Sequence, residues 1–228
     1  MTAPIDAICF DLDDTLCTYR RSPQSVLEIA FEDVGVSPLF PASEYYDRFE
    51  AYLEESTDVV DLRERCFGDL AVEAGADRAT GEAVARAYTA ERVPHDVELL
   101  AGARETVDRF AEDGEYRLAL VTNGSPEMQR RKLETIGLED DFETVVYAGY
   151  DAPAKPAPEP FELALEALGT TPDRAVHVGN SLSSDVAGAR AAGLRSVWIP
   201  DDEEAATPDL KPDWALESLS ELAASPPW

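Results

Sequence analysis

Five short apolar runs recur along the chain, and segments with helical periodicity lie between them. The runs are AICF at 7–10, RLALV at 117–121, TVVYA at 144–148, AVHV at 175–178 and SVWI at 196–199. Short β-type runs that alternate with amphipathic segments are typical of parallel strands joined by crossover helices. We therefore predict an α/β protein with a doubly wound parallel sheet.

One interval departs from this alternation. Between Leu16 and about His95 no strand pattern occurs. The interval instead holds three helix-like segments, SPQSVLEIAFEDVG (22–35), ASEYYDRFEAYLEE (42–55) and VDLRERCFGDLAVEAG (60–75). In the first, Ser22 and Pro23 are a plausible cap and first-turn residue. We predict an all-helical domain at 18–92, inserted into a core domain formed by 1–17 and 93–228.

The chain is strongly acidic, with 47 acidic residues, 19 basic residues and a formal charge of −28. Such a charge repels nucleic acids and anionic membranes, so we predict neither as a partner. A monomer is plausible. The lysines are Lys132, Lys155 and Lys211 alone. This acidic, lysine-poor composition resembles that of halophilic proteins, which work in a cytoplasm rich in salt.

The cysteines and histidines exclude several classes of site. Cys9, Cys17 and Cys66 are odd in number and form no close pair, which favours reduced thiols over a disulfide framework or a zinc site. His95 and His177 lie far apart in the sequence, which disfavours a zinc hydrolase or a Ser-His-Asp triad. Because no signal peptide or run of ~20 apolar residues is evident, we expect a cytoplasmic protein.

Unusual polar residues follow four of the predicted strands. In open α/β sheets, ligands bind at the carboxyl ends of the strands, where these residues would meet. Two carboxylates about 4 Å apart repel by roughly 4 kcal/mol at an effective dielectric near 20, so an acidic cluster there needs a reason. A bound cation is one reason, and the alternative is a solvated turn in an acid-rich chain. The candidates are Asp11 and Asp13, Thr122 and Asn123, Lys155, and Asn180 and Asp185.

Four motifs at these positions, DLDDTL, VTNG, KPAPEPF and GNSLSSDVAGARAAG, occur in this order along nearly the whole chain. Together they resemble the haloacid dehalogenase superfamily, specifically its phosphatase-like branch with a helical cap inserted after the first strand. The resemblance implies a Rossmann-like core with a small all-helical cap domain. It also implies phosphoester hydrolysis through an aspartyl-phosphate.

The residue types fit that chemistry. A carboxylate held in line with phosphorus can form an aspartyl-phosphate, a role that we assign to Asp11. Asp13, two positions on, returns to the same side of an extended chain, where it can act as general acid and base. We assign no role to Asp14.

Phosphoryl transfer also requires donors and cations around the negative oxygens. We expect the Thr122 hydroxyl and the Asn123 backbone N–H to bind phosphate, and Lys155 to neutralise both the phosphate and Asp11. Lys132 lies between basic neighbours in QRRKLETIG, and we predict that it is exposed on a helix surface.

The predicted cofactor is Mg²⁺, because hard oxygen ligands without nearby His or Cys suit this ion. The resemblance implies that the ion is held by Asp11, the main-chain carbonyl of Asp13 and an acid of the fourth motif. Asn180, however, stands where that motif usually has Asp, and Asp185 is its remaining acid. We therefore expect modest metal affinity.

The most consistent function is Mg²⁺-dependent hydrolysis of a small phosphorylated metabolite. One alternative is a 2-haloacid dehalogenase, although that branch typically lacks the second Asp. Another is a weakened, non-catalytic relative that senses phosphate or binds a partner, and phosphomutase and phosphonatase activities also stay open. Candidates for contacts to the rest of the substrate are Thr18, Tyr19, Arg20, Arg21, Arg63 and Arg65.

Overall fold

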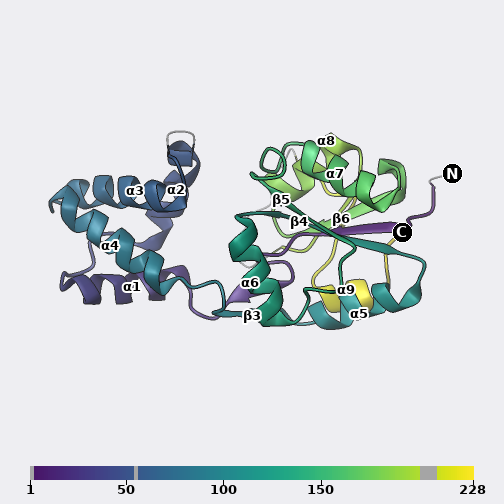
Figure 1. Cartoon of the computed structure of the whole chain (residues 1–228), viewed down its shortest axis with the longest axis horizontal. Coiled ribbons are helices and arrows are strands. Elements are labelled where there is room, and N and C mark those ends of the chain that lie inside the picture. The colour runs from purple at the N-terminus through teal and green to yellow at the C-terminus, as the bar shows by residue number, and fades with distance from the viewer. Residues whose placement is uncertain (1–2, 54–55, 201–209) are drawn as a thin grey trace. The chain divides into compact units, whose positions relative to one another are not determined.

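The computed structural model describes residues 3–53, 56–200 and 210–228 and consists of two compact units (Figure 1). Met1–Thr18 and Val97–Trp228 form one unit, called here the sheet unit. Tyr19–Asp96 forms the other, the helical unit. Within the described ranges, the helices all fall short of the length and apolarity needed to cross a membrane.

The sheet unit is built on a six-stranded parallel sheet. Its strand order is β5 (Thr144–Ala148), β4 (Arg117–Asn123), β1 (Ala7–Phe10), β6 (Ala175–Gly179), β7 (Arg195–Trp198) and β8 (Trp214–Ala215). All five apolar runs form strands, and each hydrogen-bonded pair is parallel. The predicted doubly wound sheet is confirmed, whereas the two-residue β8 was not predicted.

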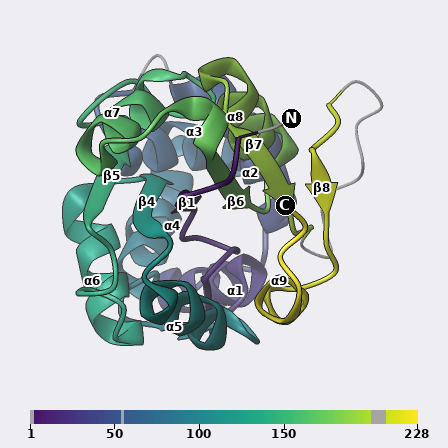
Figure 2. The same ribbon diagram turned by 90° about the vertical axis from the view of Figure 1, so that its right-hand side faces the viewer.

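Helices cover both faces of this sheet, which explains why its strands are apolar throughout. α7 (Glu159–Leu168) and α8 (Ala187–Ala192) lie on one face, and α5 (Ala103–Asp113), α6 (Pro126–Ile136) and α9 (Leu219–Ala224) on the other (Figure 2). A Cβ at Gly188 would lie 2.6 Å from the Phe161 ring. Glycine there lets α8 pack closely against α7.

The helical unit contains α1 (Pro23–Val34), α2 (Ala42–Leu53), α3 (Val59–Glu73) and α4 (Arg78–Glu91). The side chains of Ser22, Asp58 and Asp77 accept backbone N–H bonds and cap α1, α3 and α4. Buried aromatic and aliphatic side chains pack between the four helices. The three predicted helices are thus present together with an additional one, α4, and the predicted domain at 18–92 stays a prediction.

One expectation for this segment was wrong. The interval predicted to lack strands contains β2 (Cys17–Tyr19), which forms a two-stranded sheet with β3 (Val97–Leu99). A three-residue strand is too short to show a periodicity, and its partner is distant in the sequence. Pairing of this kind depends on the tertiary fold rather than on local pattern.

Salt is expected to stabilise this protein. With a formal charge of −28, the compact state repels itself, and raising KCl from about 0.1 M to 1 M shortens the Debye length from about 10 Å to 3 Å. The melting temperature should therefore rise steadily across a KCl series, which differential scanning fluorimetry would measure. An unchanged melting temperature across the series would contradict the prediction.

Candidate active site

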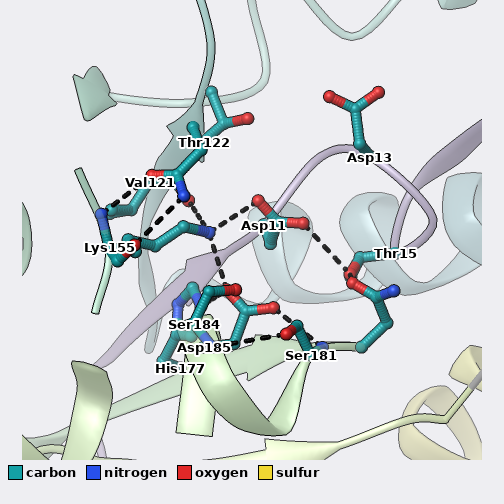
Figure 3. Close-up of polar contacts among 12 residues, drawn as sticks. Asp11, Asp13, Thr15, Val121, Thr122, Lys155, His177, Ser181, Ser184 and Asp185 are labelled. Atoms are coloured by element: carbon teal, nitrogen blue, oxygen red, sulfur yellow. Dashed lines mark hydrogen bonds and ion pairs between the residues drawn. The ribbon is translucent and has the colours of Figure 1, made fainter. Parts of the chain in front are cut away.

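The predicted site residues Asp11, Lys155 and Asp185 meet at the carboxyl edge of the sheet (Figure 3). Lys155 Nζ donates to Asp11 Oδ1 at 2.7 Å, to Asp185 Oδ1 at 2.6 Å and to the Val121 carbonyl at 2.9 Å. All three side chains are buried, with exposed fractions between 2% and 9%. One buried cation thus joins two buried carboxylates.

Asp185 is held on both of its oxygens. Oδ1 also lies 3.0 Å from His177 Nε2, and Oδ2 accepts from the Ser181 backbone N–H at 3.0 Å. A Cβ at Gly179 would lie 2.4 Å from Asp185 Cγ, so only glycine leaves room for the carboxylate there. Both Asp185 oxygens are thus paired within the protein, and a role of Asp185 as a metal ligand stays a prediction.

Burial and charge act differently on the two carboxyls. Burial raises the pKa of Asp11 to about 7 against the opposing charge of Lys155, and the negative charge of Asp185 adds to the rise. Burial would also raise the pKa of Asp185, but Lys155 and the His177 hydrogen bond outweigh it and hold that pKa below its usual range. Asp185 is therefore the more firmly ionised partner.

Asn180 and Asp11 face the same hydroxyl group. Thr15 Oγ1 lies 3.3 Å from Asn180 Oδ1 and 3.4 Å from Asp11 Oδ2. The Asn180 backbone carbonyl accepts from Trp198 Nε1 at 2.6 Å, which ties it to the end of β7. Two oxygens that are distant in the sequence, at the ends of the neighbouring strands β1 and β6, thus face one hydroxyl group. Sequence reasoning did not single out Thr15.

The loop that carries Lys155 is aligned by Asn123 at the end of β4. Asn123 Oδ1 accepts from the Lys155 N–H at 2.9 Å, and Asn123 Nδ2 donates to the Lys155 carbonyl at 3.2 Å. The Lys155–Pro156 peptide is cis. The structure thus gives the Asn123 side chain a contact that the sequence did not predict, and it places Thr122, fully buried, next to it.

Asp13 is held by α6, and this overturns one prediction. Its Oδ1 accepts from Lys132 Nζ and its Oδ2 from Gln129 Nε2 at 2.8 Å. Lys132 is 3% exposed rather than on the surface as predicted, and Gln129 is 1% exposed. The apolar residues Leu133 and Ile136 continue the same helical face back to both residues, a signal that sequence reasoning overlooked.

Three of the arginines proposed to contact the rest of the substrate make contacts within the helical unit. Arg21 forms ion pairs with Glu91 and Asp96. Arg63 is buried and donates to the Tyr45 and Thr89 hydroxyls, whereas Arg65 pairs with Asp61 one turn earlier on α3. A role of these arginines in substrate selection stays a prediction.

Comparison with known proteins agrees with this geometry. Residues 5–193 match the family model for haloacid dehalogenase-like hydrolases. The chain is 30% identical to the phosphoserine phosphatase of Thermus thermophilus, covering 94% of this chain and 96% of that protein. It is also 30% identical to the ribulose-1,5-bisphosphate 5-phosphatase of Halopiger xanaduensis, covering 95% and 97%.

Solved structures show the same fold. The HAD-hydrolase YfnB of Bacillus subtilis, bound to magnesium, superposes with a TM-score of 0.78 at 23% identity, covering 97% of this chain and 98% of that one. The family match spans most of the chain, and both relatives align along nearly their whole length. The chain therefore belongs to the haloacid dehalogenase-like hydrolases.

Proposed function

We propose that the protein is a Mg²⁺-dependent phosphomonoester hydrolase that acts on a small phosphorylated metabolite through an aspartyl-phosphate. The observation that carries the proposal is the buried Asp11 carboxylate, held by Lys155 at the carboxyl edge of the sheet, with a second carboxylate, Asp13, two residues on. Both full-length relatives described above are phosphatases by name, which supports the same reaction here.

In the first half-reaction an Asp11 oxygen attacks phosphorus while the bond to the leaving oxygen breaks in line with it. The leaving oxygen then lies on the far side of phosphorus from Asp11. The Asp13 side chain points away from the Asp11 cluster (Figure 3) and is 33% exposed, so it can reach that side. Asp13 gives its proton to the leaving oxygen, and an alcohol departs.

In the second half-reaction Asp13, now a carboxylate, takes a proton from a water molecule that attacks the phosphorus of the aspartyl-phosphate. The bond between phosphorus and the Asp11 oxygen breaks, which releases phosphate and restores the carboxylate. Lys155 balances negative charge throughout. Thr122 Oγ1 accepts from Gln129 Nε2 at 2.6 Å, which leaves its own hydrogen available for a phosphate oxygen.

The residues present fit a magnesium ion. Mg²⁺ takes one or two carboxylates and keeps several waters, and the side-chain oxygens of Asp11 and Asn180 lie near each other, both within hydrogen-bond distance of Thr15 Oγ1. Asp11 and Asp185 together carry one more charge than Lys155 balances. When bound, the ion would neutralise charge on the transferred phosphoryl group. Among the described residues, no group of three or more His, Cys, Asp or Glu is arranged to hold a metal.

Replacement of Asn180 tests this ligand set. Asn180→Asp adds a hard anionic ligand, so the half-saturating Mg²⁺ concentration should fall several-fold, both in turnover and in titration calorimetry. Without metal the added charge repels Asp11, so the melting temperature in chelator should fall as well. If both measurements stay at their wild-type values, Asn180 lies outside the metal shell.

A panel of phosphomonoesters, assayed with Mg²⁺ in molar KCl, tests the function itself. We expect phosphate release from at least one ester and none from the Asp11→Asn variant. Chloride release from 2-chloropropionate without metal would instead establish the dehalogenase alternative. Phosphate binding without turnover of any ester would establish the non-catalytic one.

A further inference from the structure

We propose that Gln129 and Lys132 on α6 are positioning residues that hold the Asp13 carboxylate in place for proton transfer. The inference rests on the proposed function, because it assigns Asp13 the proton. It goes beyond that function by making a helix outside the four sequence motifs responsible for where the proton donor lies. Neither residue need contact the reacting atoms for this role.

The contacts are strong and lie within the sheet unit. Lys132 Nζ binds Asp13 Oδ1, and Gln129 Nε2 binds Asp13 Oδ2 at 2.8 Å, so each carboxylate oxygen has its own donor. The Lys132 side chain is 4% exposed. Lysine is almost never buried unless it is paired, so a buried lysine aimed at a partly exposed carboxylate points to a specific task.

Gln129 also links Asp13 to the proposed phosphate-binding hydroxyl. Its Nε2 donates to Asp13 Oδ2 at 2.8 Å and to Thr122 Oγ1 at 2.6 Å, which uses both amide hydrogens. The nitrogen of the Gln129 amide, rather than its oxygen, thus faces both Asp13 and Thr122. One side chain therefore sets the distance between the proton donor and the phosphate-binding group.

The local chain is shaped to bring this side chain inward. Ser125 caps α6 and Pro126 starts it, immediately after β4. Gly124 adopts a φ of 142°, and a Cβ there would lie 3.1 Å from Gln129 Cδ. Glycine at this position permits both the sharp turn after β4 and the close approach of the Gln129 side chain. Gln129, in the first turns of α6, can therefore reach Thr122 near the end of β4.

Loss of Gln129 and Lys132 should lower the hydrolysis rate of some esters more than that of others. Without its two donors, the half-exposed Asp13 side chain can leave its position, and a misplaced catalytic group can cost roughly 100-fold in rate. Esters with poor leaving groups depend most on a general acid in the first half-reaction, so their kcat/KM, which reports that half-reaction, should fall about 10- to 100-fold. Esters with good leaving groups should lose little in kcat/KM, whereas kcat should fall for both classes, because hydrolysis of the aspartyl-phosphate needs Asp13 whichever alcohol has left.

The experiment compares alkyl phosphates, which have poor leaving groups, with p-nitrophenyl phosphate, which has a good one. The variants are Lys132→Met, Gln129→Met, their double variant and Asp13→Ala, alone and combined with Lys132→Met. We expect Lys132→Met to add nothing to the loss caused by Asp13→Ala, because both act through the same group. Lys132→Arg should recover part of the lost rate.

Arg131→Met is the matched control. Arg131 is the neighbour of Lys132 on α6, but its side chain is 56% exposed and pairs only with Glu127 in the described contacts. Its replacement should leave the hydrolysis rates of both ester classes unchanged. Equal losses of kcat/KM for the two ester classes in Lys132→Met, or losses that add to those of Asp13→Ala, would show a merely structural role and overturn the inference.

A crystal structure of the Gln129→Met/Lys132→Met double variant provides a test that needs no turnover. We expect the Asp13 carboxylate to leave its wild-type position or to occupy several. If it keeps one unchanged position, the inference is wrong even though the phosphatase function stands. If the wild-type protein hydrolyses no ester, the proposed function fails, and this structure alone decides whether α6 holds Asp13.

Discussion

Asp11→Asn is expected to lower kcat by about 10⁴-fold or more, a loss of the order measured when other enzymes lose a nucleophile. The amide has the shape of the carboxylate but cannot form the acyl phosphate. The fold should survive, because burial already raises the pKa of Asp11 to about 7 and so favours a neutral side chain there. Phosphate release and a thermal melt measure the two effects.

Asp14→Asn serves as the control for this change. Asp14 is an exposed acid three residues from Asp11, with a φ of 56°. Asn tolerates that left-handed conformation well, so the substitution removes the same charge without strain. Activity should stay at the wild-type level. Turnover by Asp11→Asn comparable to that of Asp14→Asn would disprove the nucleophilic role.

Lys155→Met is expected to abolish turnover and to destabilise the fold by about 3–5 kcal/mol, the cost of breaking a buried ion pair. The reason is the geometry of the site, where the Lys155 ammonium lies 2.7 Å from Asp11 and 2.6 Å from Asp185. Its removal leaves two buried carboxylates facing each other without a cation. Denaturant melts in chelator measure the loss, and a wild-type free energy of unfolding would contradict the prediction.

The loss of folding stability in Lys155→Met should become smaller as the pH falls. Without the cation, both carboxyls would have folded-state pKa values above their unfolded values. Such groups destabilise the folded state when ionised, so the variant should regain stability as the pH falls from 8 towards 5. In the wild type only Asp11 has a raised pKa, of about 7, because Lys155 and the His177 hydrogen bond hold the pKa of Asp185 below its usual range, so the wild type regains less stability over the same pH range. The difference in the free energy of unfolding between the wild type and Lys155→Met should therefore become smaller as the pH falls.

Two further variants make this test specific. Lys155→Met combined with Asp185→Asn removes one of the uncompensated charges and should recover part of the lost stability. Lys211→Met removes an exposed lysine on the same unit and should leave the melt unchanged. If Lys211→Met costs as much as Lys155→Met, the loss reflects net charge rather than the buried contact.

The class of fold could be predicted from the amino-acid sequence, because the information it requires is local. A strand covered by helices on both faces must be apolar along its whole length, as in AICF and AVHV, so each buried strand is visible as a run. The polar residues at strand ends followed from the same logic, since parallel strands present their carboxyl ends on one edge. The structure brings Asp11, Lys155 and Asp185 together there.

Which polar side chains hold these groups could not be predicted, because it depends on how the helices pack against the sheet. The sequence QRRK around Lys132 reads as a solvated helix surface, yet the packing of α6 buries Gln129 and Lys132 against Asp13, more than a hundred residues away in the chain. The short strands β2, β3 and β8 were likewise invisible, because they exist only through pairing with distant partners. The pattern of apolar residues along one helix or strand shows which of its residues are buried against a sheet. Contacts between single polar side chains depend instead on how whole helices and strands are oriented relative to one another.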